Sequence, residues 1–132
     1  MPLVRAAEAV VHDLHGARFT SYAAPSRGSR ELCAWRLDVP TGSQGVPHTV
    51  SREEVLFVLA GTVQIALGDG PAALAGAPGQ PVRPGDAVLV PAGSALRLDN
   101  PGDEPAAAWV TTSAGLEATL PDGSTLAPPW AR

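Results

Sequence analysis

The chain of 132 residues contains no lysine and only one cysteine, and each shortage excludes a class of protein. All nine basic residues are arginines, spread from Arg5 to Arg132 without clustering, against thirteen acidic residues and a net charge of −4. Nucleic-acid-binding surfaces concentrate basic side chains, so we expect no nucleic-acid partner. A lone cysteine, Cys33, cannot form an internal disulfide, and this cysteine usage is compatible with a reducing cytoplasm.

Long hydrophobic runs are also missing. The longest uncharged stretch, 55–68, is interrupted by Gly61 and Gln64, and the first fourteen residues carry two acids without the apolar segment of a signal peptide. We therefore expect no membrane partner and a cytoplasmic location.

Turn-forming residues are abundant instead, because fourteen glycines and fourteen prolines accompany a hydrophobic content of 45%. Short apolar runs lie between these turns, and none continues at helical spacing, which favours an all-β fold of antiparallel strands. Many short strands of this kind favour a closed jelly-roll β-barrel. We predict one domain over 1–132, with an N-terminal arm at 1–16 and a C-terminal tail at 121–132. The expected strands are 17–22, 31–39, 47–50, 55–59, 63–67, 87–90, 95–99, 107–112 and 117–120.

A first spaced motif occupies residues 42–61. It reads Gly42, five residues, His48, one residue, Val50, three residues, Glu54, six residues and Gly61. His48 and Val50 are two apart, so on a strand their side chains point to the same face.

A second spaced motif occupies residues 85–100. It reads Gly85, five residues, Pro91, one residue, Gly93, two residues, Leu96, three residues and Asn100. The proline and glycine turn the chain, so that Leu96 can face the first motif across the barrel.

The two spacings together resemble the signature of the cupin superfamily, G-x5-H-x-H-x3-E-x6-G followed by G-x5-P-x-G-x2-H-x3-N. This resemblance implies a small cupin barrel, also called a double-stranded β-helix. In metal-binding cupins the motifs supply three histidines and one glutamate, which suit Fe, Mn, Ni, Cu or Zn. Here Val50 and Leu96 stand at two histidine positions, and only His48 and Glu54 remain as metal ligands. We therefore expect no cofactor; the alternative is a weakly held divalent transition metal.

The altered motifs predict a largely apolar pocket around one polar pair. His48 and Glu54 are the candidate catalytic residues, because a carboxylate that accepts one imidazole N–H leaves the other nitrogen basic. His12 and His15 lie outside the motifs, and nothing in the sequence places them near the pocket. The expected pocket residues are Val50, Leu56, Val58, Leu96, Leu98 and Trp109. For Trp109 the alternative is that it packs in the core.

Three functions follow from this pocket. The first is the binding of a small hydrophobic or aromatic molecule. The second is catalysis, either by a metal-independent isomerase, epimerase or cyclase with His48 as base, or by a weakly metal-dependent dioxygenase. The third is a structural dimer module. The resemblance to cupins implies a homodimer, and the second apolar face of the strand at 55–59 requires cover of this kind.

Overall fold

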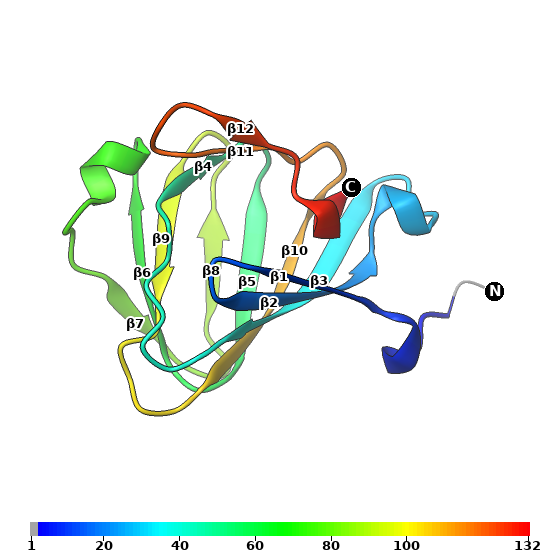
Figure 1. The fold of residues 1–132 in the computed structure, drawn as a ribbon, viewed down its shortest axis with the longest axis horizontal. Coiled ribbons are helices and arrows are strands. Elements are labelled where there is room, and N and C mark those ends of the chain that lie inside the picture. The colour runs from blue at the N-terminus through cyan, green and yellow to red at the C-terminus, as the bar shows by residue number, and fades with distance from the viewer. Residues whose placement is uncertain (1–2) are drawn as a thin grey trace.

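A computed structural model describes residues 3–132 as two six-stranded antiparallel sheets that face each other (Figure 1). The first sheet has the strand order β1-β2-β3-β10-β5-β8, and the second has the order β12-β11-β4-β9-β6-β7. The strands are β1 (Val10–Leu14), β2 (Ala17–Ala23), β3 (Leu32–Val39), β4 (His48–Val50), β5 (Glu54–Ala60), β6 (Val63–Gly68), β7 (Gln80–Val82), β8 (Ala87–Val90), β9 (Ala95–Asp99), β10 (Ala106–Ser113), β11 (Ala118–Thr119) and β12 (Thr125–Leu126).

The described residues contain no α-helix, only short 3-10 turns, so the predicted all-β class is confirmed. Every expected strand is present, with small differences at its ends. The predicted arm at 1–16 begins outside the described residues; its remainder forms the turn η1 (Ala6–Glu8) and β1, which pairs with β2. The predicted tail contains β12 and the turn η4 (Pro129–Ala131). Among residues 3–132, no helix has the length and apolar character that a membrane span requires.

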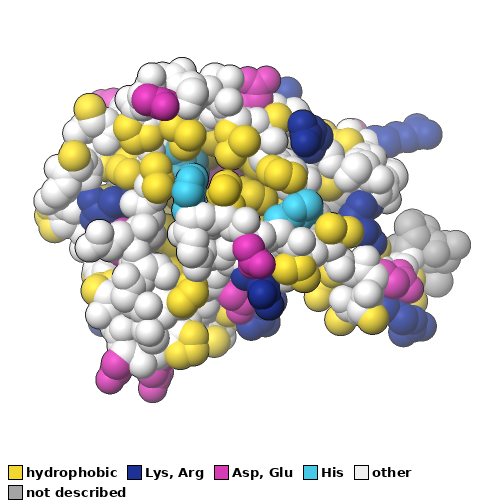
Figure 2. Space-filling model, in the orientation of Figure 1, with side chains coloured by type: hydrophobic (Ala, Val, Ile, Leu, Met, Phe, Trp, Pro, Cys, Tyr) yellow, Lys and Arg dark blue, Asp and Glu magenta, His cyan; other side chains and the backbone are white. Residues whose placement is uncertain are grey.

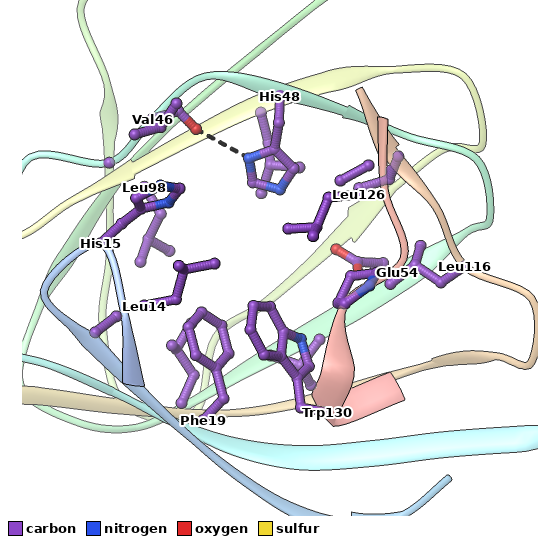
Figure 3. Close-up of a pocket in the computed structure, with 18 of the residues that line it drawn as sticks. Leu14, His15, Phe19, Val46, His48, Glu54, Leu98, Leu116, Leu126 and Trp130 are labelled. Atoms are coloured by element: carbon purple, nitrogen blue, oxygen red, sulfur yellow. Dashed lines mark hydrogen bonds between the residues drawn. The ribbon is translucent and has the colours of Figure 1, made fainter. Parts of the chain in front are cut away.

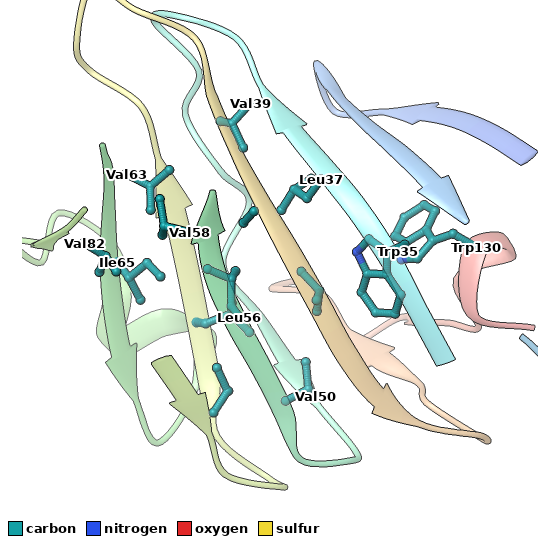
Figure 4. Close-up of a cluster of buried hydrophobic side chains, with 14 of the residues drawn as sticks. Trp35, Leu37, Val39, Val50, Leu56, Val58, Val63, Ile65, Val82 and Trp130 are labelled. Carbon is teal, nitrogen blue, oxygen red and sulfur yellow. The ribbon is translucent and has the colours of Figure 1, made fainter. Parts of the chain in front are cut away.

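The core lies between the two sheets and follows the two-residue period of the strands (Figure 4). In β3 the side chains of Cys33, Trp35, Leu37 and Val39 are buried, while Arg36 on the opposite face is exposed. This alternation places Trp35 in the core, as its spacing predicts.

The turn between β5 and β6 requires glycine. Gly61 has a φ of 69°, and a Cβ there would lie 2.5 Å from the carbonyl oxygen of Pro105. Only glycine adopts this left-handed conformation without strain and also allows so close an approach. The last glycine of the first motif is therefore a structural requirement of the barrel.

The C-terminal turn η4 is anchored at the barrel rather than lying across its outer surface. Ser21 Oγ donates a hydrogen bond to the carbonyl of Trp130 at 2.8 Å, and Cys33 Sγ approaches the carbonyl of Ala131 at 3.4 Å. The ring of Trp130 stacks on Phe19, with 3.6 Å between ring centroids and 7° between their planes. Trp130 is consequently buried.

The outer face of β5 carries apolar side chains in contact with solvent. Val55, Phe57 and Leu59 are each about two-fifths exposed, and Leu89 on the neighbouring strand β8 is more exposed still. Homodimer formation through this face stays a prediction.

Candidate functional site

A cavity of about 140 Å³ lies inside the barrel (Figure 3). Its wall is contributed by both sheets, by the β1–β2 hairpin and by the segment that leads to Trp130. In the view of the molecular surface in Figure 2, histidine side chains lie at a hollow and apolar side chains surround them. Among the described residues that line it, only His15, His48 and Glu54 have ionisable side chains.

The two motifs meet at this cavity. His48 opens β4 and lies directly opposite Leu96 of β9 in the antiparallel register. Val50 and Leu96 are both buried, and both line the cavity together with His48 and Glu54. The four positions that hold ligands in metal-binding cupins therefore all line this cavity, with apolar side chains at two of them.

His48 is held as a neutral imidazole with a defined tautomer. Its Nδ1 lies 2.9 Å from the carbonyl oxygen of Val46, which can only accept, so Nδ1 carries the proton. Burial lowers the pKa of His48 below 6.5, aided by the nearby His15 and opposed by the bond to Val46. Figure 3 shows the other ring nitrogen, Nε2, on the cavity side of the ring. Nε2 is thus a free hydrogen-bond acceptor and a base.

Glu54 is a carboxyl group without a hydrogen-bond or ion-pair partner in the described part of the chain. It is the first residue of β5 and only 7% exposed. Burial raises its pKa from 4.5 to about 7, and no neighbouring charge or hydrogen bond within the described residues contributes to the shift. At and below neutral pH a large share of Glu54 is therefore the neutral acid, which can donate a hydrogen bond.

The expected hydrogen bond between His48 and Glu54 is not formed. Figure 3 shows the two side chains on different sides of the cavity, with apolar side chains around them. The backbone carbonyl of Val46 fixes the imidazole tautomer instead of the carboxylate. The two groups therefore face a common space as separate acid and base.

Two of the expected pocket residues lie elsewhere. Trp109 is out of phase with the inward-facing Val110, so it points to the outer face of β10 and packs against Tyr22, 5.4 Å between ring centroids. Val58 is fully buried in the core, beyond the cavity wall. Contrary to expectation, Trp109 and Val58 therefore lie outside the wall of this cavity. The other four lie in the cavity wall, namely Val50, Leu56, Leu96 and Leu98.

Several wall residues come from segments that the motifs do not cover. His15 sits in the β1–β2 turn with a φ of 52°, and Phe19 follows on β2. Trp35 and Trp130 also line the cavity, and each buries an indole N–H that no described residue accepts. No sequence signal connects residue 15 with residue 130, because only the folded chain brings the two ends together.

The donor set does not fit the transition-metal site of metal-binding cupins. Within the described part of the chain, no three His, Cys, Asp or Glu side chains lie together in a way that would hold a metal ion. Structural and catalytic zinc sites, by comparison, use at least three protein ligands.

Two antiparallel sheets closed around a central cavity, with both motifs on its wall, define a double-stranded β-helix barrel. Residues 35–112 match the family model of the cupin domain, Cupin_2, and the chain belongs to this family. No curated protein matches the sequence.

Solved structures with the same fold have diverse names. The polyketide cyclase RemF from Streptomyces resistomycificus has a TM-score of 0.71 and 17% identity, over 86% of this chain and 79% of that one. An RmlC-like cupin from Shewanella frigidimarina has a TM-score of 0.64 and 18% identity, over 81% and 85%. A sugar phosphate isomerase from Silicibacter pomeroyi has a TM-score of 0.62 and 16% identity, over 89% and 84%. These similarities establish the fold.

The buried carboxyl of Glu54 makes a prediction about stability and pH. The native state keeps this proton up to about pH 7, whereas the unfolded chain releases it near 4.5, so stability falls as pH rises between the two values. We expect Glu54→Gln to remove this loss. When the pH is raised from about 5 to about 8, the free energy of unfolding of the variant, minus that of wild type, should increase by about 2 to 3 kcal/mol.

Urea unfolding at both pH values measures this gain. Glu53→Gln, the exposed neighbour, is the matched control and should show no such gain. His48 has the opposite effect, because its lowered pKa reduces the free energy of unfolding as the pH falls below 6.5. His48 is present in wild type and in both variants, so this effect cancels in the comparison. An equal pH dependence for Glu54→Gln and wild type would refute an unpaired, buried Glu54.

Proposed function

We propose that this protein binds a small, mostly apolar molecule, about the size of one aromatic ring, inside the barrel. The observation that carries the proposal is an apolar cavity of about 140 Å³, to whose wall residues 3–132 contribute only three ionisable side chains. An engineered apolar cavity of about 150 Å³ in another protein stays dry and binds benzene. Burial of an apolar ligand in such a space is favourable because it removes hydrocarbon surface from water.

The aromatic residues of the wall suit a flat ligand. Phe19 and Trp130 form a stacked pair, and Trp35 meets Trp130 edge to face with 6.4 Å between ring centroids. Aromatic pairs in offset or edge geometry contribute about 0.5 to 1.5 kcal/mol beyond the area they bury. A planar ring inside the cavity can extend these contacts, which favours aromatic over branched aliphatic ligands.

Binding of p-xylene tests this function. We expect saturable quenching or enhancement of tryptophan fluorescence, because Trp35 and Trp130 line the cavity. Ala118→Phe should weaken binding at least about tenfold by filling the cavity, since Ala118 is buried in its wall. Thr119→Phe, on the opposite face of the same strand, is the matched control and should bind as wild type does. Equal affinity in Ala118→Phe and wild type would place the ligand outside the barrel.

We also propose that the site works without a transition metal. Two of the four ligand positions of metal-binding cupins are Val50 and Leu96, whose side chains cannot coordinate a metal. The apolar surface they add to the wall also disfavours a hydrated cation.

Metal analysis checks this directly. Protein purified without chelator should contain far less than one equivalent of Fe, Mn, Ni, Cu and Zn, measured by inductively coupled plasma mass spectrometry. His48→Ala should have the same metal content as wild type. A stoichiometric metal in wild type that is lost in His48→Ala would overturn the proposal.

The presence of an acid, Glu54, and a base, His48, at one cavity supports a second candidate function, that of an enzyme that catalyses proton transfer. Neutral Glu54 can protonate a carbonyl oxygen while His48 Nε2 removes a proton from a conjugated carbon across the ring. The product is the neutral dienol, and the reverse transfers restore the ketone, so no oxidant or reductant is needed. The fold is compatible with such an enzyme, since one structural neighbour is a polyketide cyclase.

Deuterium exchange into cyclohex-2-enone tests the enzyme. In D₂O the protein should accelerate exchange at carbon 4, followed by proton NMR, because removal of that proton gives the dienol. General acid and base catalysis each typically contribute 100-fold or more, so His48→Gln and Glu54→Gln should each lower the rate by about 100-fold. Glu53→Gln serves as the control. Exchange at the wild-type rate in His48→Gln would eliminate it as the base.

A further inference from the structure

We infer that the ligand of this cavity is an uncharged single-ring molecule with a hydrogen-bond donor at the His48 end and an oxygen acceptor at the opposite end. The inference rests on the proposed binding function and adds the polarity of the ligand to it. It follows from how the few polar groups of the wall are arranged and from the charges that the wall lacks.

One end of the cavity offers an acceptor. Because the Val46 carbonyl takes the proton of His48 Nδ1, the lone pair of Nε2 is left for the ligand. Leu96 lies directly opposite His48 in the sheet and supplies no competing polar group. A hydroxyl or N–H on the ligand satisfies this nitrogen.

The opposite side offers a donor. Figure 3 shows Trp130 across the cavity from His48, with Glu54 on the side away from Val46. Glu54 lines the cavity, is only 7% exposed and has no hydrogen-bond partner among the described residues. A buried carboxyl without a partner is rare in native proteins, and in its neutral form it donates a hydrogen bond, so a ligand oxygen is the expected partner.

The wall has no lysine or arginine that could neutralise a buried anion. The sequence has no lysine, and none of its arginines lines the cavity. Of the two histidines, His48 has a lowered pKa and His15 is exposed, so neither is a buried cation. A phosphate or carboxylate inside this cavity would lose its hydration without a counter-charge, which is strongly unfavourable. We therefore expect the ligand to differ from a sugar phosphate, although one structural neighbour is named a sugar phosphate isomerase.

A series of para-disubstituted benzenes of similar size tests the inference on the wild-type protein. At about pH 6, calorimetry or tryptophan fluorescence compares p-xylene, 4-methylbenzaldehyde, 4-hydroxybenzaldehyde and 4-hydroxybenzoate. A net hydrogen bond is worth about 1 kcal/mol, so each added polar group should tighten binding about five- to tenfold, with 4-hydroxybenzaldehyde the tightest. The anion 4-hydroxybenzoate should bind at least about tenfold more weakly than the aldehyde, because its charge is desolvated.

Two substitutions identify the groups responsible. Glu54→Leu should bring 4-methylbenzaldehyde down to the affinity of p-xylene, and His48→Leu should remove the advantage of the hydroxyl in 4-hydroxybenzaldehyde. Glu53→Leu, at the exposed neighbouring position, should leave the order unchanged.

The outcomes are distinguishable. If p-xylene binds but 4-hydroxybenzaldehyde gains nothing, or if 4-hydroxybenzoate binds tightest, the inferred polarity is wrong while the binding function stands. If no probe binds, the binding function fails and the inference fails with it. The wild-type series decides both questions even where a variant does not fold.

Discussion

The burial of ionisable side chains among apolar ones inside the barrel is the constraint on which the site depends. Glu54 has no charged partner, so its protonation is set by burial alone, which raises its pKa to about 7. The same burial lowers the pKa of His48 and keeps the imidazole neutral. A neutral acid and a neutral base then coexist in one apolar space, whereas in water at neutral pH the carboxyl would be ionised.

Aliphatic side chains in place of histidines at two ligand positions change the chemistry of the barrel without changing its fold. Val50 and Leu96 occupy the same strands and face the same cavity as the histidines of metal-binding cupins would. Strand pairing depends on backbone hydrogen bonds and on the period of apolar residues, and both survive the exchange of histidine for an aliphatic side chain. The loss of two ligands leaves His48 and Glu54 as buried or part-buried ionisable residues in a mostly apolar wall.

The sequence predicted those cavity residues that lie within the two motifs. Strand periodicity placed Val50, Leu56, Leu96 and Leu98 correctly, because side chains two apart share one face of a strand. The same rule, applied strictly, excludes Trp109, since the inward position next to it is Val110. Periodicity cannot tell how far along the barrel a side chain sits. Val58 is inward-facing as expected, yet it belongs to the packed core rather than to the cavity.

By itself, the sequence determined the all-β class, the cupin barrel and the absence of two metal ligands, because motif spacing and alternation are properties of the chain before it folds. Only the tertiary structure brought His15 and Phe19 of the N-terminal hairpin together with Trp130 of the C-terminal turn to complete the cavity wall. It also decided that Val46, and not Glu54, holds the His48 ring. These outcomes depend on contacts between residues far apart in sequence and on the exact placement of buried groups, which no local pattern encodes.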